Sequence, residues 1–203
     1  MTDALPPIDP RQTALLVMDY QPGIVDSLPD AGALLERTAG AIALARGRGV
    51  TIGYVRVAFE DADYDAMPAT SRMAAIAASA GRAAFHADSP TTAVHERVAP
   101  EPGDVVVRKI RVGAFSTTDL DAQLRARGIT TLILAGISSS GVVLSTVRDA
   151  SDRDYRLLVL ADCCADREPD VHELLTARIF PKQATVIALA ELPELLEPDA
   201  ATS

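Results

Sequence analysis

The sequence of 203 residues predicts an α/β fold: a three-layer, open, doubly wound sheet of about six mainly parallel strands with helices on both faces. Three observations predict it. Apolar runs of strand length recur along the chain, stretches with helical spacing separate them, and the runs are apolar throughout instead of alternating with polar residues. Strands of this kind belong in a sheet covered on both faces, and helical connections between them make the strands parallel. We interpret residues 1–203 as one domain.

The first half of the chain holds two strands, one helix and an insertion. Residues 13–20 read as a buried strand, and 31–49 as a helix whose closing glycines are a usual stop signal. A second strand is expected over 50–59. The following segment, about 60–100, is rich in Ala, Ser, Asp and Pro, and we expect short helices and long loops there. Insertions of this kind often form a lid or a surface for a partner.

The second half alternates more regularly between strands and helices. Helix 118–128 has a Thr or Asp cap and ends in Gly, and the other elements follow from length and apolar spacing. The predicted strands are 104–110, 130–137, 155–163 and 184–189, the predicted helices are 118–128, 140–154 and 168–180, and a short closing turn covers 191–198.

Composition excludes several classes of partner. The formal net charge of −9 disfavours nucleic acid and anionic membranes, which both need clustered Lys and Arg. No apolar run is long enough to span a bilayer, and the first residues lack a signal-peptide core. The two cysteines, Cys163 and Cys164, are adjacent and form no disulfide framework. We therefore expect a cytoplasmic protein that binds neither nucleic acid nor a membrane.

Two charged residues stand at the ends of predicted strands, where ligands bind in open parallel sheets. Asp19 directly follows the first strand, and a partly desolvated carboxyl group there can move protons near neutral pH. A capping or turn aspartate is the alternative. Lys109 lies inside an apolar strand, where a lysine must snorkel or pair, or else marks a sheet edge. An ion pair between Asp19 and Lys109 on neighbouring strands would compensate the charges of both residues.

A third candidate is the turn after the fourth strand, which ends at Ile137 and continues as "SSSGVV". Backbone N–H groups at the start of a helix suit a developing oxyanion or a carboxylate. Simple capping by the serines is the alternative.

The sequence indicates no metal and no cofactor. The three histidines, His86, His95 and His172, lack metal-ligand spacing, and no Cys-x-x-Cys or glycine-rich phosphate loop occurs. Cys163 and Cys164, where the fifth strand ends, are interpreted as small buried hydrophobes. A displaced catalytic thiol is the alternative and would need a neighbour that lowers its pKa.

Taken together, the motifs resemble those of the isochorismatase-like hydrolases, often called cysteine hydrolases. The resemblance runs from "TALLVMDYQPG" to "ATVIALAEL". Three motifs carry it, each after its expected strand: Asp19 followed by Gln21, "KIRVGAF" from Lys109 to Phe115, and "GISSSGVVLST" from Gly136 to Thr146.

The resemblance implies that an Asp, a Lys and a Cys act together on an amide carbonyl. Asp19 and Lys109 match the first two, but the cysteine position falls on Val142. Valine is no nucleophile, so an amidase route through a thioester is not available from this position. Ser138, Ser139 and Ser140 precede it, and no histidine near them in the sequence would activate them.

Family members that cleave isochorismate-type vinyl ethers also lack the cysteine and keep the acid. We therefore predict hydrolysis of a small, carboxylate-bearing molecule by Asp19 acid/base catalysis with Lys109, without a covalent thiol step. One alternative is a catalytically inactive member that binds a small ligand or a partner protein. Another is a nucleophilic Cys164.

The resemblance also implies the pocket and the assembly. Gln21, Phe115, Ile137, Ser138 and Gly141 would form the substrate pocket and oxyanion site, with a cis peptide near Ile137–Ser138. It further implies a six-stranded parallel sheet and a homo-oligomer, either a dimer or a tetramer.

Overall fold

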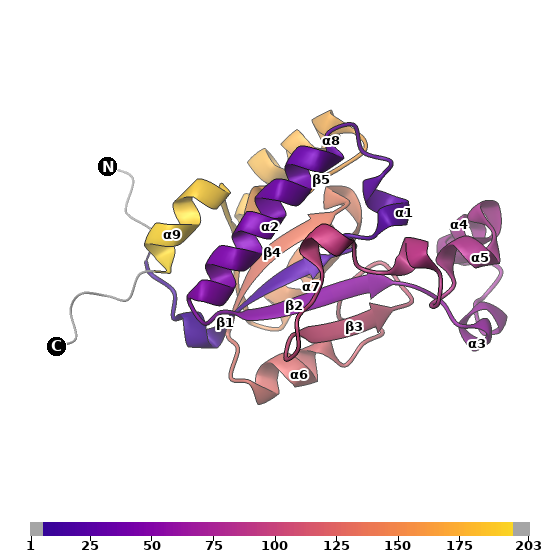
Figure 1. Ribbon diagram of the computed structural model, residues 1–203, viewed down its shortest axis with the longest axis horizontal. Helices are drawn as coiled ribbons and strands as arrows, with labels where there is room; N and C mark the ends of the chain where they lie inside the picture. Colours follow the sequence, from indigo (N-terminus) through magenta and orange to yellow (C-terminus); the bar gives the residue numbers. More distant parts are fainter. Residues whose placement is uncertain (1–5, 197–203) are drawn as a thin grey trace.

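The computed structural model of the protein describes residues 6–196. Its core is a single sheet of parallel strands in the order β3-β2-β1-β4-β5-β6 (Figure 1). This confirms the predicted fold class and the parallel sheet. The strands are β1 (Thr13–Met18), β2 (Thr51–Val57), β3 (Val105–Lys109), β4 (Thr131–Ile137), β5 (Arg156–Ala165) and β6 (Thr185–Ile187).

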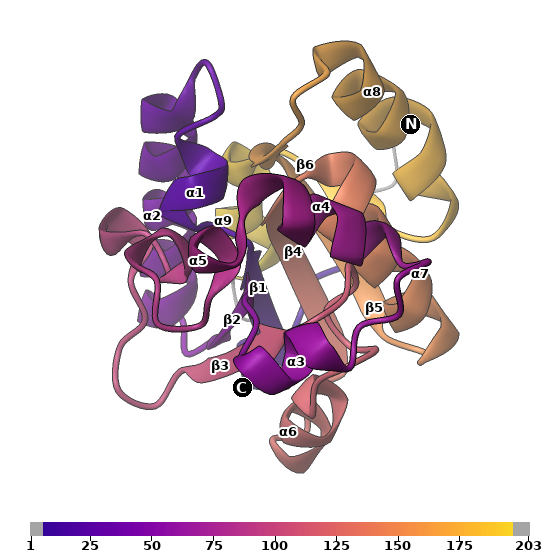
Figure 2. The same ribbon diagram turned by 90° about the vertical axis from the view of Figure 1, so that its right-hand side faces the viewer.

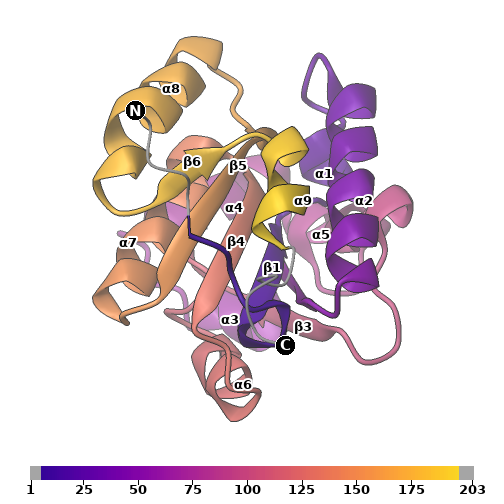
Figure 3. The same cartoon turned by 90° about the vertical axis from the view of Figure 1, so that its left-hand side faces the viewer.

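Helices cover the sheet on both faces, as Figure 3 shows when the molecule is seen along the strands. On one face lie α2 (Ala31–Gly47) and α9 (Leu192–Leu195), and on the other α6 (Leu120–Ala126), α7 (Leu144–Asp152) and α8 (Pro169–Leu174). Among the described residues, none of the helices is long and apolar enough to cross a membrane.

The central strand β1 shows why the apolar runs are unbroken. Leu15 and Val17 pack into the core under α2, whereas Leu16 and Met18 pack into the core under α6 and α7. Successive side chains of a strand point to opposite faces, so a strand covered on both sides has no solvent-facing position. Every residue of β1 is buried accordingly.

Two predicted helices are each divided into shorter elements. The turn Ser139–Val143 is a π-helix and precedes α7, so the predicted helix 140–154 begins with irregular backbone. Likewise α8 is followed by a π-helix over Leu175–Ile179 and a 3-10 turn over Phe180–Lys182. Pro181 lacks an N–H donor and contributes to this irregular end.

The termini of other elements differ from prediction too. Strand β5 continues to Ala165, so Cys163 and Cys164 lie within it, which corrects their expected position where the strand ends. A 3-10 turn over Leu189–Glu191 precedes α9 in the closing turn, whose residues 197 and 198 lie outside the described residues. A short helix α1 (Pro22–Val25) was not predicted.

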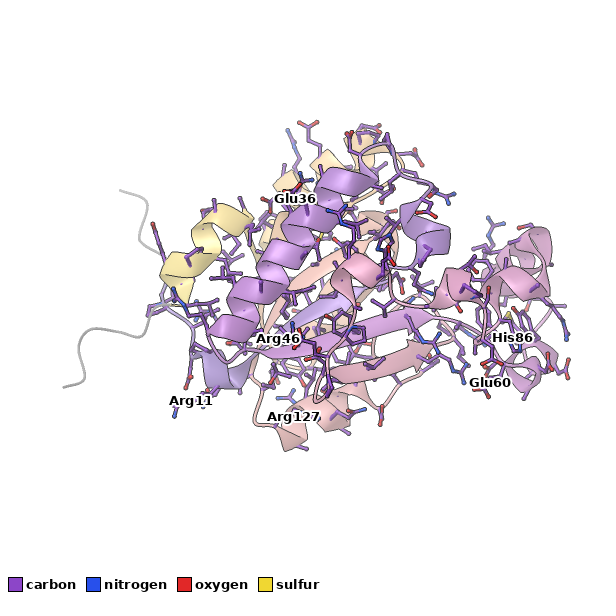
Figure 4. All side chains as sticks on the ribbon, in the orientation of Figure 1. Arg11, Glu36, Arg46, Glu60, His86 and Arg127 are labelled. Atoms are coloured by element: carbon purple, nitrogen blue, oxygen red, sulfur yellow. The ribbon has the colours of Figure 1, made fainter. Side chains whose placement is uncertain are left out.

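Residues 61–85 form short helices beyond the carboxyl ends of the strands, as Figure 2 shows from that end, whereas the turn at 96–98 packs back against α2. A parallel bridge joins Phe59 to His86, so the helical excursion 60–85 starts and ends at one place. Figure 4 labels Glu60 and His86, which lie together on this projecting part. The elements are α3 (Asp61–Asp65), α4 (Arg72–Ala80), α5 (Arg82–Phe85) and the 3-10 turns Pro90–Thr92 and Glu96–Val98.

Candidate active site

Asp19 and Lys109 form a buried ion pair at the carboxyl ends of the strands. The Lys109 Nζ atom lies 2.9 Å from Asp19 Oδ2, and the side chains are only 2% and 7% exposed. Lys109 Nζ also donates to the Arg111 carbonyl oxygen at 3.1 Å. The lysine thus satisfies its charge by pairing, because at this depth it cannot reach solvent.

The sequence suggested that this pair would join neighbouring strands, and that expectation is wrong. Strand β2 lies between β1 and β3, so Lys109 reaches Asp19 across the end of β2. Asp19 is fixed there through its N–H, which donates to the Val55 carbonyl of β2 at 2.8 Å. Its φ of +60° is in the left-handed region, which aspartate tolerates better than most residues. This conformation turns the chain sharply where the strand ends.

Burial raises the pKa of Asp19 to about 6, and the Lys109 ammonium opposes part of that rise. The carboxyl group can therefore carry or release a proton near neutral pH. Its Oδ1 atom is buried and has no hydrogen-bond partner among the described residues. An acceptor left unpaired in this way costs free energy unless something binds to it.

A cavity of about 400 Å³ opens over this pair. Asp19, Lys109, Ile137, Ser138, Gly141 and Val142 all line it, so six of the residues named from the sequence meet at one cavity. Its volume suits a small-molecule ligand. Apolar side chains make up much of the rest of the wall and come from four different elements and their connections: Ile24, Leu28, Val57, Met73, Ile76, Phe85 and Val112.

The turn after β4 is held by its own side chains. The peptide bond between Ile137 and Ser138 is cis, as the resemblance implies. Ser138 Oγ accepts from the Gly141 N–H at 3.1 Å, so this N–H serves as a cap and not as a free oxyanion donor. A Cβ at Gly141 would lie 2.7 Å from the same oxygen, which explains why glycine occupies the position.

Two residues that the resemblance places in the pocket lie outside it. Gln21 is buried, and its side-chain amide forms hydrogen bonds with backbone groups. Its Nε2 atom donates to the Val57 and Thr92 carbonyls, and its Oε1 atom accepts from the Val57 N–H. Phe115 stacks on Tyr155 with ring centroids 6.0 Å apart. Both therefore stabilise the framework behind the cavity and do not line it.

The serines of the turn need a further correction. No histidine is near them in the sequence, yet Ser139 Oγ lies 2.7 Å from His172 Nδ1 of α8. Ser139 is completely buried and does not line the cavity, so the pair fastens the turn to α8. The Ser140 N–H donates to Asp166 Oδ2 at 2.8 Å and adds a second attachment.

The cysteines lie away from the ion pair. Cys164 is buried, its Sγ atom is 3.8 Å from the Leu134 carbonyl oxygen, and burial raises its pKa well above the usual value. Burial also raises the pKa of Cys163 to about 12. Both are protonated at neutral pH and are not among the residues lining the cavity. Within residues 6–196, no three His, Cys, Asp or Glu side chains are grouped to hold a metal ion.

Sequence reasoning missed Arg167, which also lines the cavity. It follows β5, and its Nη2 atom donates to Ser27 Oγ at 3.3 Å. Asp166 and Glu168 flank it on the same rim. The signal was present, because three consecutive charged residues directly follow an apolar strand in a parallel sheet.

Comparison with known proteins decides the family. A family model described as the Isochorismatase domain matches residues 13–191. This chain belongs to the isochorismatase family. Among isochorismatase-family relatives, the maleamate amidohydrolase of Pseudomonas putida is 31% identical over 182 residues, or 87% of this chain and 83% of that protein. The ureidoacrylate amidohydrolase RutB of Methylobacterium radiotolerans is 32% identical over 192 residues, or 85% of this chain and 74% of that protein.

Solved structures of the isochorismatase family superpose over nearly the whole chain. An isochorismatase family protein from Burkholderia thailandensis has a TM-score of 0.82 at 30% identity, covering 96% of this chain and 100% of that one. A cysteine hydrolase from Pseudomonas syringae has a TM-score of 0.83 at 25% identity, covering 97% and 98%. The fold and the family hydrolase scaffold are therefore shared.

Proposed function

We propose that this isochorismatase-family protein hydrolyses a small, carboxylate-bearing molecule by acid/base catalysis at Asp19, without a covalent thiol step. One observation carries the proposal. The Asp19 carboxyl group lines the cavity, and Lys109 holds its Oδ2 atom while Oδ1 is unpaired among the described residues. Burial raises the pKa of this group to about 6, so it can exchange a proton near neutral pH. That is the arrangement of a positioned proton donor.

Vinyl ether hydrolysis is the reaction that fits these groups. The protonated Asp19 carboxyl delivers its proton to the enol carbon of the substrate, and the ether oxygen stabilises the resulting oxocarbenium ion. Water adds to that ion, and the hemiketal formed collapses to a ketone and an alcohol. Asp19 recovers a proton when water adds, so no group on the protein is consumed.

Lys109 has two roles in this scheme. Its ammonium stabilises the ionised Asp19 that forms after proton delivery, and it places a positive charge beside the substrate. Arg167 supplies a second cation on the cavity rim. A guanidinium group binds a carboxylate in a planar, two-point manner, which supports a substrate that bears one.

The amidohydrolase names of the relatives point to amides as the other substrate class. Val142 argues against the covalent route, since an aliphatic side chain is buried at the cavity floor where the resemblance places the thiol. Cys163 and Cys164 offer no replacement, because both thiols are buried and protonated.

Val142 also favours a second candidate function: an inactive family member that binds a small ligand or a partner protein. Two observations support the hydrolase over it. The cavity is open above the ion pair and not filled by Val142. The buried pair is costly to retain for stability alone, because hydrophobic replacements of buried ion pairs are often neutral or stabilising.

The test is a substrate panel of isochorismate, related vinyl ethers, maleamate and ureidoacrylate, run on the wild type and on Asp19→Asn. We expect turnover of a vinyl ether that is lost in Asp19→Asn. Turnover of an amide that Cys164→Ala abolishes would overturn the mechanism. Ligand binding without turnover of any compound would support the inactive binder instead.

A further inference from the structure

The rim of the cavity exposes apolar side chains to solvent. Ile76 on α4 and Val112, after β3, are 45% and 44% exposed, and both line the cavity. In the part of the chain that the structure describes, the other exposed large hydrophobic side chains are Val106 and Leu174, at 47% and 52%. Two of these four side chains, Ile76 and Val112, therefore line a single cavity, where a bound ligand would cover them and remove them from water.

The apolar surface continues inward from the rim. Met73 and Phe85 line the same cavity and also pack on the small core formed by Val57, Phe59 and Ala77. The charged groups occupy other positions: Asp19 and Lys109 at the buried end, and Arg167 on the rim with its acidic neighbours. The cavity thus offers charged groups at its buried end and on its rim, and apolar side chains along much of the remaining wall.

Hydrogen bonds and ring contacts of Phe59 hold part of this wall to the sheet. The Phe59 N–H donates to the Phe85 carbonyl and the Ala87 N–H donates to the Phe59 carbonyl, each at 2.8 Å. Phe59 contacts the rings of Tyr64 and Phe85, with centroids 5.3 and 6.0 Å apart. A preformed wall favours binding, because little conformational freedom is lost when a ligand settles against it.

Arg108 attaches the helical excursion to the sheet. Its Nη1 atom donates to the Ala58 carbonyl at 3.1 Å and to Asp63 Oδ2 at 2.5 Å, and its Nη2 atom lies 3.2 Å from Glu60 Oε1. Because Arg108 precedes Lys109 on β3, the segment that carries Ile76 is tied to the same strand as the ion pair.

We propose that Ile76 and Val112 are specificity-determining residues that select a small carboxylic acid whose body is an apolar ring. The proposal rests on the proposed function for placing the acid group near Lys109 and Arg167. A cavity of about 400 Å³ accommodates a six-membered ring with its carboxylate. Removing ring carbons from water favours binding of such an acid over a short one by at least about tenfold.

The test measures binding without turnover. Dissociation constants of cyclohexanecarboxylate, benzoate, acetate and succinate are determined by calorimetry for the wild type, Ile76→Ser/Val112→Ser and the control Val106→Ser/Leu174→Ser. The control removes equally exposed apolar side chains that do not line the cavity. We expect the preference for ring acids over acetate to fall about tenfold in the first variant and to persist in the control.

Three results would overturn the proposal: no ring preference in the wild type, an equal loss in the control, or an Ile76→Ser/Val112→Ser variant that keeps the preference. A change in sedimentation of that variant without a change in ligand preference would also overturn it, since the patch would then contact a second copy of the chain. A retained ring preference in a protein that hydrolyses nothing would support this proposal and overturn the proposed hydrolase alone.

Discussion

Asp19 Oδ2 and Lys109 Nζ are 2.9 Å apart across the end of β2, where both side chains are almost completely buried. The contact links strands that do not pair with each other, so it depends on the whole β3-β2-β1 arrangement. It also divides the carboxyl group into one oxygen that is held and one that is unpaired in the described structure. The chemistry proposed above depends on that division.

Asp19→Asn should lower turnover about 100-fold or more, because the amide cannot deliver a proton. It should also reduce the free energy of unfolding by about 3–5 kcal/mol, since Lys109 would keep a buried, unpaired charge. Urea denaturation and steady-state kinetics measure the two effects. The control is Asp19→Asn/Lys109→Met, which removes the stranded charge. It should recover most of the stability and none of the activity, and recovered activity would contradict a proton-donor role.

The pH dependence follows from the raised pKa of Asp19, about 6. A general acid must be protonated, so kcat/KM should fall as the pH rises through about 6. A rate that instead rises through this window would make Asp19 a base. The same shift lowers stability with rising pH between 3.8 and about 6, because the folded chain keeps a proton that the unfolded chain has lost. Comparing denaturation of the wild type with Asp19→Asn isolates this contribution.

Val142→Cys should introduce a reactive thiol into the cavity that Lys109 also lines, and a nearby ammonium favours the thiolate. Iodoacetamide should then alkylate position 142 at least about tenfold faster than Cys163 or Cys164, whose burial raises their pKa. Mass spectrometry of the peptides measures these rates. Adding Lys109→Met should slow the alkylation, and unchanged reactivity in that double variant would mean that the lysine does not act on this position.

His172→Ala should reduce the free energy of unfolding by about 1–3 kcal/mol, because the Ser139 hydroxyl loses its partner inside the protein. The matched control is Ser139→Ala/His172→Ala, which should cost less than the sum of the single changes. Burial lowers the pKa of His172, although Asp166 opposes this. Its contribution to stability is therefore present above pH 6.5 and lost as the pH falls. If the losses of unfolding free energy in Ser139→Ala and His172→Ala sum to the loss in the double variant, the contact makes no net contribution to stability.

Arg167→Gln should weaken the binding of small carboxylates about tenfold or more and leave the free energy of unfolding within about 0.5 kcal/mol, as is usual at the surface. Calorimetry with cyclohexanecarboxylate measures the affinity. Arg11 is a salt-bridged surface arginine that does not line the cavity and lies at the opposite end of the molecule from His86 (Figure 4), so Arg11→Gln provides the control. Equal weakening in both variants would mean that only the net charge of the protein matters.

Much of the fold follows from local patterns. The strands could be predicted because an unbroken apolar run of this length is typical of a strand covered on both faces of the sheet. Asp19 was identified because it directly follows such a run. The order of the strands in the sheet could not be predicted in the same way, so the strand of Lys109 was expected directly beside the strand that precedes Asp19. The pairing of Ser139 with His172 joins residues 33 positions apart. Such contacts depend on how α8 packs, which no local pattern records.

The cavity wall shows a second limit. Residues 60–100 have no strong periodicity, so the sequence predicted only short helices and loops there. Ile76 and Phe85 line the site because the bridge between Phe59 and His86 folds the excursion back on itself. Gln21 illustrates the reverse case: it belongs to a motif, yet its amide binds backbone groups of β2 and the Pro90–Thr92 turn.

The bridge between Phe59 and His86 brings the two ends of the 60–85 excursion next to each other. A segment whose ends meet can change in length and composition without moving the strands that flank it. A change confined to residues 60–85 can therefore alter the ligand preference of the cavity while Asp19 and Lys109 stay in place. Grafting alternative 60–85 segments between Phe59 and His86 is a direct way to diversify this scaffold.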